Sequence, residues 1–261
     1  EFMRKLFILS IIFTVVFAQD RSVTITGTCL LEGELDHSGT EILFEAVSGS
    51  AETNTFTTDQ NGEYTAGLPE GIYVITFSKD GFIPITLPGE INFFDDDELE
   101  LVELLVGTVQ EVSGTLDGNQ YWTDNFQYRV TGDLTLNQGD TLSIDPGVSI
   151  LFMGEYEFII NGAFYANGAE EDSIRFTSGQ PVKDKGDWKW LEFNNADSTS
   201  FLNYTVLEYG GGSENSSSDS NIRIYYSTLF INNSDIHLSN NSGIYGADAE
   251  LTLNNSFITN N

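Results

Sequence analysis

Short runs of alternating apolar and polar residues fill most of the chain after residue 22. In "VTITGTCLL" (23–31), "TEILFEAV" (40–47) and "GIYVITFSKDG" (71–81), apolar or aromatic residues recur at every second position, and Gly, Pro, Asn and Asp separate the runs. A period of two is typical of β-strands with one buried face, because successive side chains point to opposite sides of a strand. Few stretches have helical periodicity. The pattern therefore predicts an all-β protein.

Before Gly107, further strands are expected over 53–59, 62–68 and 97–105. "TTDQNGEY" places Asp59–Gly62 in a tight turn between two of them, where Asn61-Gly62 supplies the positive φ that a hairpin turn requires. This segment is thus expected to consist of short strands joined by hairpin-like turns.

The order of motifs in this segment resembles the carboxypeptidase regulatory-like domain. After a first strand come T-x-D-x-x-G-x-Y at 57–64, L-P-x-G-x-Y at 68–73 and G-F at 81–82. The resemblance implies a transthyretin-like β-sandwich over residues 23–106, which in that family is a non-catalytic accessory of secreted and surface proteins. No zinc-ligand set accompanies it, because His37 and His237 are the only histidines of the chain.

After Gly107, a pattern of alternating apolar residues followed by Asn-Asn recurs at a fixed spacing. "LFINNS" (229–234) returns as "LTLNNS" (251–256), an offset of 22 residues. A period in the low twenties fits one coil of a solenoid, and a parallel β-helix would stack the apolar residues of one copy on those of the next. Asn at matching bends would form hydrogen-bonded ladders and tolerate a left-handed conformation. The pairs expected to stack are Leu229 with Leu251 and Ile231 with Leu253.

Three stretches resemble the N-terminal coils of right-handed β-helix domains in secreted bacterial proteins. They are 122–154, with G-D-L-T-L and L-x-I-x-P-G-V, 160–179, with G-x-x-x-A-N-G and I-x-F-T-S, and 186–195, which begins G-D-W. The resemblance implies a right-handed parallel β-helix over residues 107–261. Both Asn-Gly pairs of 160–179 then become bends between stacked strands. We expect Ile160, Phe164, Ala166, Ile174 and Phe176 to point into the coil and Arg175 and Thr177 to point outward.

The two ends of the chain are read separately from the fold. Residues 1–2, ahead of Met3, indicate a cloning scar. Residues 3–18 combine a basic start, an apolar run and a small-residue end, which is typical of a secretory signal peptide and too short for a membrane span. We therefore expect a bacterial protein that is secreted or on the cell surface, without a transmembrane span in the mature chain. Because 260–261 fall in the middle of a coil, the β-helix is expected to be incomplete at the C-terminus.

Charge narrows the range of partners. The chain has 40 Asp and Glu against 10 Lys and Arg, a formal net charge of −30. Such a polyanion repels nucleic acid and anionic lipid. The lone Cys29 excludes an intramolecular disulfide and is expected to be a small buried residue.

The acidic run at 95–100 raises the question of calcium, which prefers hard oxygen ligands. Consecutive carboxylates do not have the spacing that wraps an ion, so a solvated loop is predicted and no metal or other cofactor is expected. Asp95, Asp96 and Asp97 remain the calcium alternative.

Many β-helix proteins are polysaccharide lyases or hydrolases. Lys183, Lys185 and Lys189 in "PVKDKGDWKW" form the best basic patch behind Gly107, and they could meet an acidic sugar; the alternative is a charged loop that enters a strand. Glycoside hydrolysis needs two carboxylates at a set separation. The sequence around His237 lacks the Asp pairs and Arg-x-Lys of such sites, so His237 is expected to be a surface strand residue. We predict no catalytic residue.

Aromatic side chains suit carbohydrate, because flat rings stack on sugar faces. Tyr225 and Tyr226 are the expected exposed pair, since they follow the Gly/Ser-rich insertion 210–221. Insertions on solenoids often gather on the binding face.

The sequence therefore predicts a non-catalytic secreted or cell-surface protein with an adhesive, scaffold or glycan-binding role, whose partner is a polysaccharide or cell-surface glycan. The alternative is a polysaccharide lyase or glycoside hydrolase with its active site partly in missing C-terminal coils.

Overall fold

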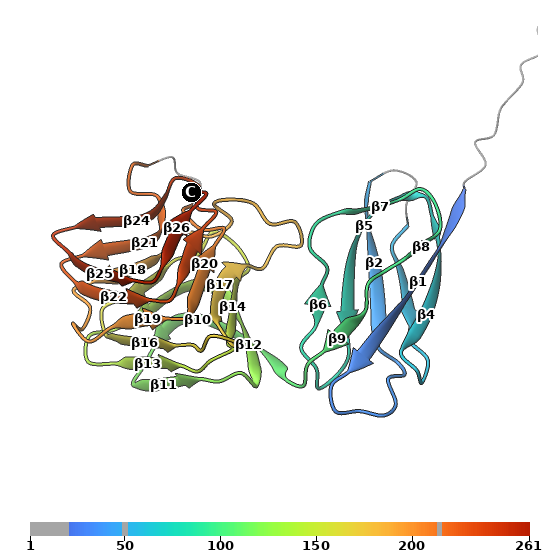
Figure 1. Ribbon diagram of the computed structural model, residues 1–261, viewed down its shortest axis with the longest axis horizontal. Coiled ribbons are helices and arrows are strands. Elements are labelled where there is room, and N and C mark those ends of the chain that lie inside the picture. The colour runs from blue at the N-terminus through green and yellow to red at the C-terminus, as the bar shows by residue number, and fades with distance from the viewer. Residues whose placement is uncertain (1–20, 49–51, 213–215) are drawn as a thin grey trace, which may run out of the picture.

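The computed structural model describes residues 21–48, 52–212 and 216–261, and every regular element in these ranges is a β-strand. The strands form two units side by side, a sandwich followed by a parallel β-helix (Figure 1). The expected all-β fold is confirmed. The cloning scar and signal peptide lie outside the described residues. No helix in the described ranges is long and apolar enough to cross a bilayer.

The N-terminal unit packs two sheets face to face. The first contains β1 (Ser22–Leu31), β4 (Glu63–Pro69), β8 (Asp97–Glu98) and β9 (Val102–Leu104). The second contains β2 (Glu41–Ser48), β3 (Asn54–Thr57), β5 (Gly71–Ser78), β6 (Ile85–Thr86) and β7 (Ile91–Phe93). The period-two pattern turns alternate apolar side chains between the sheets, where Phe44, Tyr73 and Phe77 are fully buried. Cys29 is buried there too, and its burial raises the pKa of the thiol to about 11.

The turn at Asp59–Gly62 forms, but it does not close a hairpin. Gly62 has a φ of 81°, and the Asp59 carboxylate accepts hydrogen bonds from the backbone N–H groups of Asn61 and Glu63. However, β3 pairs with β2 and β4 pairs with β1, so the turn carries the chain from one sheet to the other. A side chain at position 62 would collide with the Cys29 carbonyl oxygen.

The strand predicted over 97–105 is divided into β8 and β9. Both lie parallel to β1, β8 beside Ile25–Thr26 and β9 beside Cys29–Leu31. The Leu99 N–H, just after β8, still donates to the Thr26 carbonyl. The chain then leaves β1 and returns to it at β9.

The β-helix has three faces, named here in chain order within each coil. The first face contains the N-terminal half of β12 (Phe126–Leu136), then β14 (Ser149–Phe152), β17 (Ile174–Ser178), β20 (Thr205–Glu208), β23 (Asp235–His237) and β26 (Phe257–Thr259). The second contains the C-terminal half of β12, then β15 (Phe158–Ile160), β18 (Leu191–Asn194), β21 (Ser220–Tyr225) and β24 (Ser242–Ala247). The third contains β11 (Asn119–Trp122), β13 (Thr141–Ile144), β16 (Ala163–Asn167), β19 (Phe201–Asn203), β22 (Thr228–Asn232) and β25 (Glu250–Asn254). β10 (Thr108–Leu116) lies parallel to β12 and follows it around the same bend.

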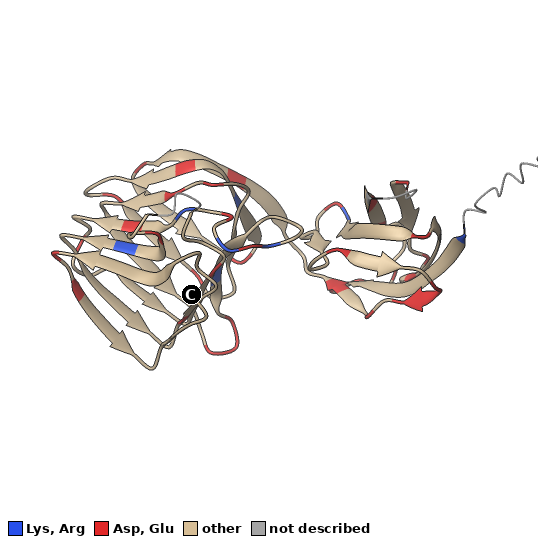
Figure 2. Ribbon diagram, turned by 90° about the horizontal axis from the view of Figure 1, so that it is seen from above, with Lys and Arg blue, Asp and Glu red and all other residues tan. Residues whose placement is uncertain are grey.

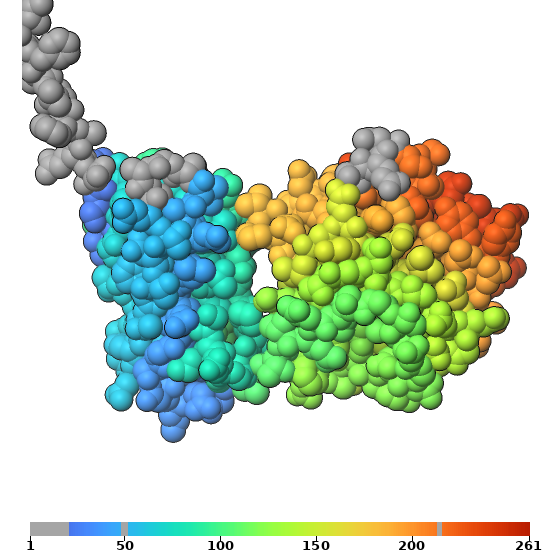
Figure 3. All heavy atoms as spheres, turned by 180° about the vertical axis from the view of Figure 1, so that it is seen from behind, coloured from blue at the N-terminus to red at the C-terminus, as the bar shows by residue number. Residues whose placement is uncertain are grey.

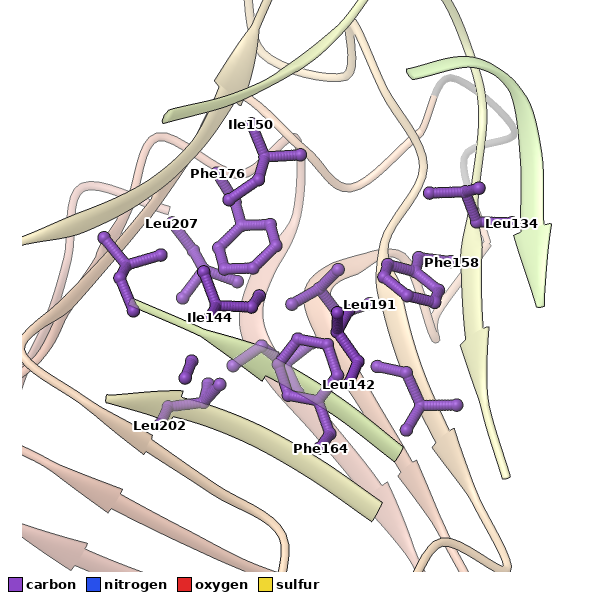
Figure 4. Packing of buried hydrophobic residues seen from close by; sticks show 14 of the residues in the cluster. Leu134, Leu142, Ile144, Ile150, Phe158, Phe164, Phe176, Leu191, Leu202 and Leu207 are labelled. Carbon is purple, nitrogen blue, oxygen red and sulfur yellow. The ribbon is translucent and has the colours of Figure 1, made fainter. Parts of the chain in front are cut away.

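One apolar core runs through the middle of the coils. Figure 4 shows side chains from all three faces pointing toward one another, and Phe164 contacts Phe158, Phe176 and Phe193 with ring centroids 5.6–6.2 Å apart. The five residues of 160–179 expected to point inward are all fully buried. The core packing predicted from that stretch is confirmed.

The 22-residue repeat stacks as predicted. Leu229 lies opposite Leu251 and Ile231 opposite Leu253. The amide of Asn254 donates to Asn232 at 2.9 Å, and that of Asn255 to Asn233 at 3.4 Å. Asn233 and Asn255 have φ values of 50° and 48°, so Asn provides both the ladder and the bend.

The longest insertions into the basic coil lie at one corner. Strands β11, β13 and β16 follow one another in register at the short spacing, whereas segments 179–190 and 209–219 are inserted between the first and second faces of two successive coils. The two insertions contact each other, because Gly186 N–H donates to the Gly210 carbonyl and Gly211 N–H donates to the Lys189 carbonyl. This corner is therefore the elaborated edge of the solenoid.

Two sets of contacts connect the sandwich to the β-helix. At the covalent link, Gly107 N–H donates to the Gly81 carbonyl. At the second contact, Gly89 N–H of the sandwich donates to the Pro181 carbonyl of the first insertion at 3.2 Å. Figure 3 shows the two units touching at both places with a hollow between them.

Candidate functional site

A cluster of charged side chains lies on the outer side of the first face. Glu208 is 7% exposed, and one of its oxygens accepts hydrogen bonds from Arg175 at 2.7 Å and from the Thr177 hydroxyl at 2.9 Å. Its other oxygen lies 3.0 Å from His237 Nε2. Asp235 lies on the far side of the same imidazole, 3.1 Å from Nδ1. Strands β17, β20 and β23 thus bring together four charged or titratable side chains from three coils.

The cluster keeps Glu208 ionised. Burial alone would raise the pKa of this carboxyl, but the charge of Arg175 and the hydrogen bonds from Arg175, Thr177 and His237 outweigh it and hold the pKa below its ordinary value. Both carboxylate oxygens are occupied by donors, so the group is poorly suited to take or give a proton.

The structure refines one expectation at this cluster and corrects another. Thr177 does lie on the outer side of its strand, but it is only 2% exposed, because the first insertion covers it and Lys183 Nζ donates to its hydroxyl at 3.1 Å. His237 is not a simple surface residue either, since its side chain is 20% exposed between two carboxylates.

The three predicted lysines do not form one patch. Lys183 lies against Thr177 and the ring of Tyr209, and burial lowers the pKa of its ammonium group, with Glu208 opposing. Lys185 donates to the Asn260 carbonyl in the last coil. Lys189 lies over Trp190 on the second face.

Tyr225 and Tyr226 point in different directions. Tyr225 is half-buried and packs against Tyr245 of the next coil, with ring centroids 6.0 Å apart. Tyr226 is 64% exposed and has a φ of 49°, so it turns the corner between the second and third faces. There it lines a shallow depression with Asp248 and Glu250.

The carboxylates Asp95, Asp96 and Asp97 have separate partners. Asp95 lies 3.7 Å from Arg21, Asp96 accepts the Thr24 N–H, and Asp97 accepts the Glu98 N–H. Within the described ranges, no three His, Cys, Asp or Glu side chains are grouped as they would be around a metal ion.

The second face carries its own covered cation. Arg223 is 8% exposed, pairs with the fully buried Asp219 at 3.0 Å, and stacks on the Trp190 ring at 3.0 Å from its centroid. Its neighbour in the sheet is Glu192, whose carboxyl pKa is raised mainly by burial.

The third face differs from both, because its strands carry almost no charge. Strands β11, β13, β16, β19 and β22 contain no Asp, Glu, Lys or Arg, although the chain contains 40 acidic and 10 basic residues. Figure 2 shows the same contrast, with charged positions concentrated elsewhere on the ribbon. The outward positions carry hydroxyl, amide and aromatic groups instead.

An outward aromatic row lies on this uncharged surface. Tyr165 stacks on Phe201 with ring centroids 5.5 Å apart, and Phe201 lies opposite Phe230 in the next strand. Phe230 is 37% exposed, and Tyr121, which lies two strands before Tyr165 with Ser143 between them, is 71% exposed. The Tyr165 hydroxyl lies 2.8 Å from that of Thr199.

Sequence reasoning did not single out these four aromatic residues, because each occurs in a different coil. The period-two alternation does place each of them next to a buried residue in the sequence, so that it points outward. Tyr165, for example, lies between the buried Phe164 and Ala166. The available signal was the lack of charge in the outward positions of successive third-face strands.

Comparison with known proteins places the β-helix in a family. The model of the pectate-lyase-like β-helix domain matches residues 114–255, which is more than half of the chain. A search of curated proteins found no match.

Three solved structures are similar over about a third of the chain. A type II cohesin–X-dockerin complex from Acetivibrio cellulolyticus is 16% identical over 33% of this chain and 58% of that one, with a TM-score of 0.26. A DUF3823 family protein from Parabacteroides merdae is 18% identical over 33% of this chain and 45% of that one, with a TM-score of 0.24. The Bacillus anthracis TIE protein is 17% identical over 35% of this chain and 19% of that one, with a TM-score of 0.25. The chain thus spans less than two thirds of each, and similarity this low carries no inference about function.

Proposed function

Because the chain belongs to the family of pectate-lyase-like β-helix domains, we propose that it is a non-catalytic, secreted or cell-surface protein that binds polysaccharide through the third face of its β-helix. The N-terminal sandwich serves as an accessory domain of the carboxypeptidase regulatory-like kind, which presents the β-helix to its ligand.

The observation that carries this proposal is the uncharged third face in a chain of net charge −30. Interaction surfaces are depleted of charge and enriched in aromatic residues at their centres, because burying an unpaired charge is costly. Tyr165, Phe201 and Phe230 provide apolar contact area, and the Asn and Thr side chains beside them provide donors and acceptors. A neutral sugar chain offers the matching combination of C–H faces and hydroxyl groups.

The geometry of the third face suits a polymer better than a single sugar. Neighbouring strands lie about 4.8 Å apart, so the outward groups repeat at that spacing along the solenoid. A chain laid across the strands would meet one set of groups per coil, and weak contacts would add along its length.

The buried cluster on the first face supports a non-catalytic role. A general acid or base needs a pKa near the working pH and a proton that can leave. Glu208 has a lowered pKa and three donors around it, which is the environment of a structural ion pair.

The test is binding of the full chain to a panel of neutral and acidic polysaccharides in affinity gels and by calorimetry. We expect retention by at least one neutral polysaccharide and about tenfold or greater weakening in the double variant Phe201→Ser and Phe230→Ser. The matched control is Phe94→Ser, which removes a 57% exposed aromatic side chain from the sandwich and should leave binding unchanged. Failure to bind any polysaccharide, or an equal loss in the control, would contradict the proposal.

The second candidate is a polysaccharide lyase or glycoside hydrolase, and the feature that favours it is the 20% exposed imidazole of His237, which Glu208 and Asp235 hold in place. The same panel separates the two. New reducing ends or unsaturated sugars, abolished by His237→Ala, would establish turnover and overturn the non-catalytic proposal.

A further inference from the structure

The sandwich and the β-helix enclose a cleft of about 620 Å³. One wall is the outer side of the first face, with Gln127, Arg129 and Leu151, and the other is the outer side of β5 and β6, with Thr76 and Thr86. The covalent link at Gly107 bounds one end, and the Gly89–Pro181 hydrogen bond bounds the other. The hollow between the units in Figure 3 lies in this region.

The cleft contains cations that have no carboxylate partner. Arg129 donates through Nε to the Gln127 side-chain oxygen at 3.1 Å, and Lys183 donates to the Thr177 hydroxyl. No ion pair involves either cation within the residues that the structure describes. The remaining N–H groups of the Arg129 guanidinium therefore lack a protein acceptor there.

The composition of the walls is unusual for this chain. The lining residues include Arg129 and Lys183 but no Asp or Glu, whereas acidic residues outnumber basic ones by 40 to 10 overall. In Figure 2, blue segments lie on the loop that reaches from the β-helix toward the sandwich. A cleft lined by cations and by no carboxylate attracts an anion in so acidic a protein, although Glu208 and Asp187 act on Lys183 from outside the lining.

Other side chains of the cleft could help to bind an anion. Gln127 is 9% exposed and accepts from Arg129 through its oxygen, which leaves its amide N–H₂ as a donor on the same wall. Burial lowers the pKa of Lys183, which indicates a partly desolvated ammonium group that would gain from an anionic partner. Leu151, Met153 and Ile85 add apolar surface beside these donors.

We propose that the cleft between the two units is a binding site for an oxyanion, a carboxylate or sulfate group, held between Arg129 and Lys183 with the Gln127 amide as an additional donor. The Thr76 and Thr86 hydroxyls of the sandwich contact the body of the ligand. The site is separate from the third face, and it requires both units.

The experiment is calorimetry on the full chain at low ionic strength with an alginate tetramer, which carries four carboxylates, and with cellotetraose, a neutral tetramer. We expect the alginate tetramer to bind at least tenfold more tightly, and Arg129→Met and Lys183→Met each to weaken it about tenfold or more, because charge-assisted hydrogen bonds are lost. Inorganic sulfate is a competitor in a second arm. Competition identifies the free anion as sufficient, and its absence at the same concentrations identifies the sugar-borne carboxylate as the ligand.

The matched control is Lys185→Met, which removes a lysine from the same loop that lies outside the cleft. Its affinity for the alginate tetramer should equal that of the unaltered chain. Equal affinity for both tetramers, no binding of either anion, or an equal loss in Lys185→Met would overturn the proposal. Thermal unfolding of each variant verifies that the fold is retained.

Discussion

The first and third faces of the β-helix are built from the same coils, yet they differ in almost every surface property. The first face carries Arg175, Glu208 and His237 in one hydrogen-bonded cluster that the 179–190 insertion partly covers. The third face is uncharged over five strands, and its aromatic row lies open. The charges of the first face are paired where the insertion covers them. A loop that excludes water raises the free-energy cost of an unpaired charge, so each covered charge needs a partner.

The difference shows where a solenoid can change without losing its core. Both faces turn the same kind of apolar residue inward, since Phe176 of the first and Phe164 of the third are both fully buried. Only the outward positions and the corner loops differ. The core and the outer surface are therefore encoded at alternate positions of the same strands.

Among substitutions of outward-facing residues, the largest expected effect comes from removing the centre of the first-face cluster. Glu208→Ala leaves Thr177 and His237 without their acceptor in a covered site, and we expect a loss of about 2–4 kcal/mol in the free energy of unfolding. Chemical denaturation measures it. Glu103→Ala, at an exposed position of the sandwich, is the control. A change below about 0.5 kcal/mol would show that the cluster is not structural.

The same carboxyl should control stability in acid. Its pKa is lower in the folded chain than in the unfolded chain, so its contribution is present above the unfolded value of about 4.3 and is lost as the pH falls through the folded value. In Glu208→Gln this part of the acid dependence should disappear. Unfolding midpoints measured from pH 7 down to pH 3 test it, and an unchanged slope would contradict the prediction.

The next largest effect on stability is expected from a substitution at the bend that ends β22. Asn233 has a φ of 50° at the corner that leaves β22, and its amide donates to Asn203 at 3.1 Å. Asn233→Ala should cost about 1–2 kcal/mol, because alanine resists the left-handed conformation and cannot join the ladder. Asn233→Gly separates the two effects, since glycine accepts the conformation but makes no side-chain hydrogen bond. Equal losses in both would attribute the effect to the ladder.

The aromatic row should contribute less to stability. Phe201→Ser removes a cross-strand ring pair with Tyr165, which predicts a loss of about 0.5–1 kcal/mol in the free energy of unfolding. If the loss equals that of the buried Phe164→Ala, expected at about 3–5 kcal/mol, the row is part of the core and not an open surface.

The smallest expected effect is a stability that changes with pH in the opposite direction. Glu192 on the second face has a raised pKa, mainly through burial, so its ionisation disfavours the folded state and stability falls as the pH rises through the folded value. Glu192→Gln should therefore be slightly more stable than the unaltered chain at pH 7 and equal to it in acid. Paired unfolding curves at the two pH values decide it, and a loss at pH 7 would contradict the assignment.

Local patterns were sufficient to predict the features that depend on one or two neighbouring coils. Alternation identified the inward residues of 160–179, and the short repeat identified the stack of Leu229 on Leu251. The Asp59–Gly62 turn was located correctly, but which strands it joins depends on long-range pairing that no local motif contains.

The candidate surfaces depend on register across coils of unequal length. Glu208 lies beside Thr177 and His237 because it is 31 residues after Thr177 and 29 residues before His237, which is one coil in each case. Tyr165 and Phe201 are 36 positions apart for the same reason. Lengths of insertions cannot be derived from alternation, so the sequence alone could not align these side chains.

The 22-residue coil has a consequence for how such a surface can evolve. Duplication of one such unit adds a complete strand to each face, with its bend and its core residues, and leaves the neighbouring coils unaltered. The uncharged face would lengthen by about 4.8 Å with each duplication. If the third face binds polysaccharide as proposed, the number of coils sets the length of polymer that it can contact.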